Sequence, residues 1–189
     1  MKARVGVLIS GRGSNMASLV EASHASDCPY EIVLVISNVP DAPGLAFAAA
    51  NGIPQFALSH KGMKRVEYDS IIDGVLRDAN VEYVALAGYM RLLSPEFVAK
   101  WAGRIVNIHP ALLPAYKGVD THQRVLDAGE TKHGATVHIV TAELDDGPIL
   151  AQAEVPVFPS DDVDALAARV LIEEHKLYPK AMADLVRRR

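Results

Sequence analysis

The chain has 189 residues, half of them hydrophobic, and a formal net charge of -4. This composition allows a substantial buried core and carries no basic excess that would indicate nucleic-acid binding. Its one cysteine, Cys28, excludes an internal disulfide and a multi-cysteine zinc site. The sequence shows neither a signal peptide nor a segment apolar enough to span a membrane, so we expect one cytoplasmic domain over residues 1–189.

The first hundred residues alternate short apolar runs with helical patterns. Runs typical of strands covered on both faces lie at 4–10, 31–37 and 83–87. Helices are expected to begin near Asn15, near Pro43, near Lys64 and at Ser94, where Pro95 follows a serine N-cap. This order predicts a Rossmann-like, doubly wound α/β sheet that is mostly parallel, with about residues 1–100 as its nucleotide- or phosphate-binding half.

The second half continues the sheet with a different order of strands and helices. We expect a strand at 105–109, a short helix at 119–128 stopped by Gly129, and strands at 136–140 and 149–157. Turn chemistry between the last two strands predicts a hairpin or a pair of edge strands, so that the sheet contains antiparallel strands in its C-terminal half. A final helix is expected to start near Ser160 and to end before Pro179.

The segment IVNIHP places Asn107 and His109 two residues apart in an apolar run that ends at Pro110. In a strand, alternate side chains share a face, so the amide and the imidazole project together. Proline ends the ladder where His109 emerges, which is a position suited to an active site. For these two residues alone, a buried strand whose polar groups are satisfied by backbone is an equally good interpretation.

The loop SGRGSN after the first expected strand has the character of an anion site. Gly11 and Gly13 let backbone approach a ligand, the following helix offers N–H groups, and Ser14 and Asn15 add side-chain donors. Met16 stands where a dinucleotide fingerprint needs glycine, and no Walker A motif is present, so nicotinamide, flavin and ATP binding are not indicated. A tight turn without a ligand is the alternative interpretation.

Two other segments carry polar or exposed character. Asp145 and Asp146 form an acidic turn after a strand that carries Thr136 and His138, and a carboxylate brought near His109 could relay protons through water. As an isolated pair, the two aspartates would be turn formers only. The segment LAGYMRLL could line an apolar pocket, although its spacing favours core packing, and the histidine spacing gives little reason to expect a metal.

Taken together, five motifs give the chain a family resemblance. SGRGSN, SNVPDAPGLAFA, LAGYMRLLSPEFV, NIHPALLPAYKG and HGATVHIVTAELDDGPILAQ occur in this order. The chain thereby resembles the phosphoribosylglycinamide formyltransferases of the formyltetrahydrofolate-using superfamily, from about residue 5 to residue 178. The resemblance implies transfer of the formyl group of 10-formyltetrahydrofolate to the amine of glycinamide ribonucleotide (GAR) in purine biosynthesis, without a metal, by a monomer or homodimer acting on small molecules.

The resemblance also implies roles for individual residues. The catalytic trio falls on Asn107, His109 and Asp145, in a second half (about 101–189) that is catalytic and folate-binding. Residues implied to bind the ribonucleotide are Gly13, Ser14, Asn15 and Glu174. Residues implied to contact the folate are Arg65, Met90, Arg91, Leu93, Glu143, Leu144 and Asp145.

The chain departs from the family pattern at Ala111, Asp120 and Leu171, which puts details of the ribonucleotide contacts in doubt. Other functions remain as alternatives. A formyltetrahydrofolate hydrolase usually has an additional N-terminal domain, and a methionyl-tRNA formyltransferase a C-terminal RNA-binding domain, for which the chain leaves no room. A regulatory nucleotide-binding module would have little use for a matched amide, imidazole and carboxylate.

Overall fold

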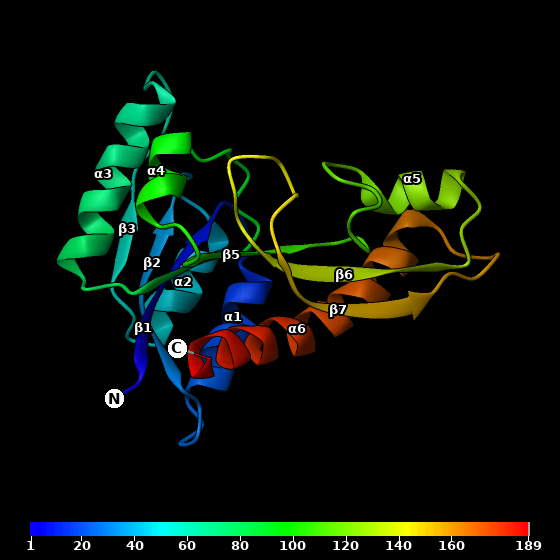
Figure 1. Cartoon of the computed structure of the whole chain (residues 1–189), viewed down its shortest axis with the longest axis horizontal. Helices are drawn as coiled ribbons and strands as arrows, with labels where there is room; N and C mark the ends of the chain where they lie inside the picture. Colours follow the sequence, from blue (N-terminus) through cyan, green and yellow to red (C-terminus); the bar gives the residue numbers. More distant parts are fainter. Residues whose placement is uncertain (189) are drawn as a thin grey trace.

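The structure is a computed structural model that describes residues 1–188, and it is built around one seven-stranded sheet (Figure 1). The strand order across the sheet is β3-β2-β1-β4-β5-β6-β7. The strands are β1 (Ala3–Ile9), β2 (Tyr30–Ser37), β3 (Gln55–Ala57), β4 (Tyr83–Leu86), β5 (Ile105–His109), β6 (Lys132–Ile139) and β7 (Ile149–Pro156). The helices are α1 (Ser14–Ser23), α2 (Pro43–Ala50), α3 (Arg65–Asp78), α4 (Pro95–Lys100), α5 (Thr121–Asp127) and α6 (Val163–Arg187).

The strand directions confirm the expected mixed sheet. β1 to β5 are parallel to one another, whereas β6 is antiparallel to both β5 and β7. Because β1 lies between β2 and β4, the connections diverge at its carboxyl end, where ligands bind in open α/β sheets. The parallel strands bring the loops after β1, β4 and β5 to this same edge.

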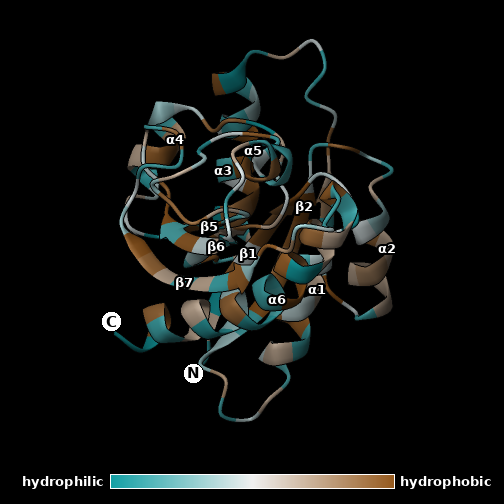
Figure 2. Cartoon of the chain, turned by 90° about the vertical axis from the view of Figure 1, so that its right-hand side faces the viewer, coloured by the Kyte–Doolittle hydropathy of each residue, from teal (hydrophilic) through white to brown (hydrophobic). Residues whose placement is uncertain are grey.

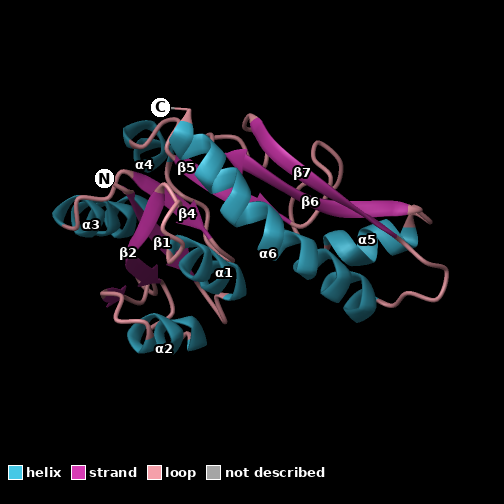
Figure 3. Cartoon of the chain, turned by 90° about the horizontal axis from the view of Figure 1, so that it is seen from below, coloured by secondary structure: helices cyan, strands magenta, loops and turns pink. Residues whose placement is uncertain are grey.

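Helices cover both faces of the sheet (Figure 3). α1, α2 and α6 lie on one face, where Met16 and Leu19 are fully buried, and α3 and α4 lie on the other, where Tyr68 and Ile72 are fully buried. Figure 2 shows hydrophobic residues concentrated in the strands, and helices such as α1 and α6 in which hydrophilic and hydrophobic residues are mixed. This double coverage explains why the parallel strands are nearly continuous apolar runs.

The predicted helix cap at Ser94 is confirmed, whereas one short strand and one strand start differ from the predictions. Ser94 caps α4 as predicted, because its hydroxyl accepts a hydrogen bond from the Phe97 N–H at 3.2 Å. The sequence does not predict β3, which has three residues, two of them exposed, and therefore lacks an apolar run. β6 begins at Lys132, four residues before the predicted Thr136.

The final helix corrects one prediction. The sequence predicts an end before Pro179, and this is wrong, since α6 runs from Val163 to Arg187 with Pro179 inside it. Tyr178 and Met182, on either side of the proline, are fully buried. The Tyr178 hydroxyl also donates to backbone carbonyls of β4 and β5. This packing compensates for the backbone hydrogen bond that proline cannot make.

β6 and β7 form the expected hairpin, which extends the sheet beyond the parallel strands (Figure 1). α6 lies along this hairpin, and the loop of residues 140–148 between its strands folds back toward the carboxyl end of β5. Within residues 1–188, no helix combines the length and the apolar character needed to cross a membrane.

Candidate active site

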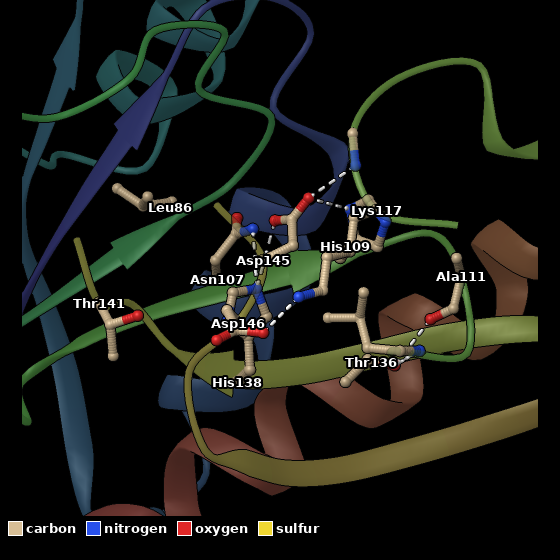
Figure 4. Close-up of polar contacts among 12 residues, drawn as sticks. Leu86, Asn107, His109, Ala111, Lys117, Thr136, His138, Thr141, Asp145 and Asp146 are labelled. Carbon is tan, nitrogen blue, oxygen red and sulfur yellow. Dashed lines mark hydrogen bonds and ion pairs between the residues drawn. The ribbon is translucent and has the colours of Figure 1, made fainter. Parts of the chain in front are cut away.

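The polar residues of β5 and β6 meet on one face of the sheet. In β5, Asn107 and His109 project away from the core that their apolar neighbours enter, as the alternation predicts. The antiparallel register sets Asn107 opposite His138 and His109 opposite Thr136. These four side chains therefore line one face at the end of β5, and the 140–148 loop brings Asp145 over them (Figure 4).

His109 lies between two oxygen acceptors and is 5% exposed. Its Nε2 is 2.8 Å from the Tyr116 carbonyl oxygen, so this nitrogen carries a hydrogen and donates it. Its Nδ1 faces Asp145 Oδ2 at 3.5 Å, and the same Oδ2 accepts a 2.9 Å hydrogen bond from the Gly118 N–H. With an acceptor at each ring nitrogen, the imidazole can hold and release a proton at Nδ1.

The orientation of Asn107 is set by His138. Burial is the largest influence on the His138 ring and lowers its pKa, despite opposing effects of the Ile139 carbonyl and Asp145. Its Nδ1 lies 3.1 Å from the Ile139 carbonyl, so the neutral ring has its hydrogen there. Nε2 then accepts from Asn107 Nδ2 at 3.3 Å, which turns the amide nitrogen toward the hairpin.

Thr136 anchors the loop that follows β5. Its hydroxyl donates to the Ala111 carbonyl at 2.7 Å and accepts from the Leu113 N–H at 3.0 Å. Gln152 on β7 donates to the Leu113 carbonyl at 2.8 Å. The loop is thereby fixed against the hairpin before it reaches Tyr116, whose carbonyl orients His109.

The loop after β1 has the geometry of an anion site. Gly13 is the N-cap residue of α1 and has φ 68°, a left-handed conformation that favours glycine. A Cβ at this position would lie 2.9 Å from the Met16 side chain. Since Gly13 has no side chain, none caps the first-turn N–H groups of α1, and uncapped N–H groups at a helix N-terminus can bind an anion.

Asn15 connects this loop to α6 through a buried pair. Its Nδ2 donates to Glu174 Oε1 at 3.1 Å, and the two residues are 9% and 7% exposed. Burial raises the pKa of Glu174, and the hydrogen bond from Asn15 opposes that rise. Asn15 Oδ1 is buried and has no hydrogen-bond partner among residues 1–188, so it can accept from a ligand donor.

Apolar side chains are exposed on two of the loops near this edge of the sheet. Met90 is 75% exposed on the loop after β4, and Leu144 is 52% exposed on the 140–148 loop. The Met90 N–H donates to Ser10 Oγ at 2.8 Å, which connects this loop to the end of β1. Exposed apolar residues of this kind are typical of ligand-binding surfaces.

The other residues implied to contact folate are more dispersed. Arg91 stacks over the Tyr68 ring, with the guanidinium carbon 4.9 Å from its centroid, and Leu93 is half-buried. Arg65 is exposed as the first residue of α3, and Glu143 is exposed on the 140–148 loop.

The positions that depart from the family pattern are accommodated in the fold. Ala111 is fully buried and contacts Thr136 through its carbonyl, which does not depend on the side chain. Asp120 is the N-cap residue of α5 at φ 55°, a conformation that aspartate tolerates. Leu171 is half-buried on α6.

Several functional groups were not assigned from the sequence. His138 orients Asn107, the Tyr116 carbonyl orients His109, and the Gly118 amide holds Asp145. Alternation along β6 already places His138 and Thr136 on one face. The register between β5 and β6 is needed to bring that face to Asn107, and backbone partners carry no residue-type signal.

A pair of histidines lies between α5 and β6. His122 Nδ1 and His133 Nε2 are 2.9 Å apart, with their rings edge to face. Burial lowers the pKa of both, to about 4 for His133. Among residues 1–188, no group of three or more His, Cys, Asp or Glu is arranged to hold a metal ion.

Comparison with known proteins relates this architecture to one family. Residues 3–182 match the family described as formyl transferase. The chain is 44% identical to phosphoribosylglycinamide formyltransferase of Haemophilus influenzae, over 93% of this chain and 84% of that protein. It is 46% identical to human trifunctional purine biosynthetic protein adenosine-3, over 96% of this chain but 18% of that longer protein. A crystal structure of phosphoribosylglycinamide formyltransferase from Brucella melitensis superposes with a TM-score of 0.95 at 48% identity, covering 98% of this chain and 96% of that one.

Proposed function

The chain belongs to the formyl transferase family, and on this premise we propose that it transfers a formyl group from 10-formyltetrahydrofolate to the amine of GAR. One observation carries the proposal. His109, Asn107 and Asp145 converge at the end of β5, with His109 Nδ1 3.5 Å from the carboxylate. An imidazole, an amide and a carboxylate so arranged can stabilise an oxyanion and move a proton.

The reaction requires one bond to form and one to break. The GAR amine attacks the formyl carbon on N10 of the folate, giving a tetrahedral intermediate with a negative oxygen. The new C–N bond remains, and the bond from carbon to N10 breaks to give formylglycinamide ribonucleotide and tetrahydrofolate. One proton passes from the attacking nitrogen to N10, and no covalent bond to the enzyme is needed.

We assign stabilisation of the oxyanion to Asn107 and His109. One hydrogen of Asn107 Nδ2 is directed at His138 Nε2, so the other is the candidate donor to the oxyanion. His109 Nε2 donates to Tyr116, so Nδ1, which lies beside Asp145, is the nitrogen assigned to donate a hydrogen to the oxyanion. Each pre-positioned donor of this kind contributes roughly 2.7–4 kcal/mol to the transition state.

Asp145 is assigned to proton transfer. Its Oδ2 is held by the Gly118 N–H and lies 3.5 Å from His109 Nδ1, so the carboxylate can exchange a proton with that nitrogen, directly or through water. It can also accept the proton of the attacking amine, directly or through water, and return it to N10. General acid–base assistance of this type contributes about 10² to 10⁴ in rate.

The loop after β1 supports binding of the other substrate end. We assign the GAR phosphate to the first turn of α1 at Gly13, Ser14 and Asn15. Glu174, held by Asn15, is assigned to donors on the ribonucleotide, and the exposed apolar surface at Met90 and Leu144 to the pterin of the folate. These substrates are small soluble molecules, consistent with a cytoplasmic enzyme.

Release of tetrahydrofolate distinguishes this function from its alternatives. We would mix the purified chain with 10-formyltetrahydrofolate and follow the change in folate absorbance with and without GAR. GAR-dependent release is expected. Release without GAR would indicate a hydrolase instead, and no release in either case would indicate a module that binds without catalysis.

A further inference from the structure

The two loops that hold His109 and Asp145 meet at two adjacent contacts. The Gly118 N–H donates to Asp145 Oδ2 at 2.9 Å. One residue away on each loop, the Lys117 ammonium forms an ion pair with the Asp146 carboxylate. The contacts therefore run antiparallel, with 117 joined to 146 and 118 joined to 145, immediately beside the reacting groups (Figure 4).

The 140–148 loop has few contacts that would hold its tip by itself. At its base, the Ile139 N–H donates to the Pro148 carbonyl at 2.9 Å, and a Cβ on Gly147 would lie 1.7 Å from the Ile139 carbonyl. Toward the tip, the Thr141 hydroxyl donates to the Glu143 carbonyl at 3.4 Å, which is a long hydrogen bond.

The backbone at Asp145 has a less common conformation. Asp145 has φ 49°, in the left-handed region, which aspartate tolerates better than most residues but adopts less readily than glycine. Both Leu144 and Asp146 beside it are exposed. The Asp145 carboxylate is 3.8 Å from His138 Nε2 through Oδ1, and the shorter contact, 2.9 Å to Oδ2, comes from the Gly118 N–H of the opposite loop.

The opposite loop is fixed well enough to serve as the support. The Arg124 guanidinium donates to the carbonyls of Lys117 and Val119 at 2.7 and 3.2 Å, and it stacks over the Tyr116 ring at 5.4 Å. The position of the Lys117 backbone is therefore set by α5. Forming the ion pair therefore orders the Lys117 side chain but does not have to order its backbone as well.

We propose that Lys117 and Asp146 form an electrostatic latch that positions the Asp145 carboxylate against His109. The proposal rests on the formyl-transfer function proposed above. Both latch residues act through Asp145 and are positioning residues. Because their side chains are 36% and 55% exposed, the interaction is partly screened by water and salt.

The test uses a double-mutant cycle on kcat and on the hydrogen exchange of the Gly118 amide. The variants are Lys117→Met, Asp146→Asn, the double variant and the swapped pair Lys117→Asp/Asp146→Lys. Glu154→Gln is the matched control, because it removes one charge from the exposed Lys132–Glu154 pair at the other end of β6. Asp146→Asn leaves Lys117 in place, so it separates a latch from a direct contact between Lys117 and substrate.

Each single variant is expected to lower kcat between about 1.5-fold and fivefold and to speed Gly118 exchange, which is the range for an exposed ion pair. The double variant should have the same kcat and the same Gly118 exchange rate as either single variant. The swapped pair should recover part of the lost kcat, and Glu154→Gln should have the kcat and the exchange rate of wild type. The KM for GAR should not change.

Three results would overturn the latch. The first is a kcat in the double variant that is lowered by the product of the two single effects, and the second is a kcat that falls in Lys117→Met but not in Asp146→Asn. The third is a Gly118 exchange rate that is unchanged in the variants. If the wild type transfers no formyl group, the proposed function fails, and the exchange measurements still decide the latch.

Discussion

The His122–His133 pair makes the fold sensitive to acid in a way that one substitution can isolate. His133 is 1% exposed, and its Nε2 lies 2.9 Å from His122 Nδ1. At most one hydrogen fits between these nitrogens, so the folded pair resists protonation. His133→Gln replaces the buried imidazole by an amide that does not titrate and can still hydrogen-bond to His122.

The sign and size of the effect follow from the shifted pKa. Burial and the charges of His122 and His109 lower the pKa of His133 from 6.5 to about 4. Between these values the unfolded chain binds a proton that the folded chain does not. This contribution to the free energy of unfolding is complete well above pH 6.5 and decreases as the pH falls. At about 1.4 kcal/mol per pKa unit the full effect is on the order of 3 kcal/mol, most of which is lost between pH 6.5 and pH 4.

Urea unfolding at pH 4 to 7.5 measures this contribution. The difference in unfolding free energy between wild type and His133→Gln should decrease by on the order of 2–3 kcal/mol as the pH falls from 6.5 to 4. His24→Gln, at an exposed histidine after α1, is the control and should give a curve parallel to wild type. Parallel curves for His133→Gln as well would refute the reasoning.

Three further substitutions test the assigned roles. Asn107→Ala should lower kcat about 10²- to 10³-fold in steady-state assays through loss of one oxyanion donor, and an unchanged kcat would exclude that role. Gly13→Ala should lower the free energy of unfolding in urea by about 1–2 kcal/mol, because φ 68° disfavours a side chain. The same variant should need more inorganic phosphate than wild type to displace GAR. If wild type and Gly13→Ala need the same phosphate concentration, the anion binds elsewhere. Glu174→Gln should weaken GAR binding about ten- to hundredfold by calorimetry through loss of a charged acceptor, and wild-type affinity would contradict the assignment.

The parts of the fold that depend on local chemistry could be predicted from the sequence. Alternation in 105–109 predicts the shared face of Asn107 and His109, and Ser94 before Pro95 predicts the start of α4. β3 could not be predicted, because three mostly exposed residues carry no periodic signal. At Pro179 the sequence carries a strong local signal that is misleading. Proline predicts a helix end, but the packing of Tyr178 and Met182 against distant residues keeps α6 continuous.

The site required information that a single sequence does not contain. The family resemblance predicts a role for Asp145, but the distance from Asp145 to His109 depends on how the 140–148 loop folds back. Likewise, His138 contacts Asn107 through the register between two strands that are separated by more than twenty residues. Neither arrangement follows from residue periodicity, because both are set by tertiary pairing.

Asp145→Asn tests the central claim most directly. Asparagine tolerates φ 49° and can still accept from the Gly118 N–H, so the substitution removes the charge and leaves the loop contacts. With both substrates saturating, kcat should fall about 10²- to 10⁴-fold while calorimetry shows GAR affinity unchanged within about twofold. A kcat close to that of wild type would contradict proton transfer through Asp145 and His109.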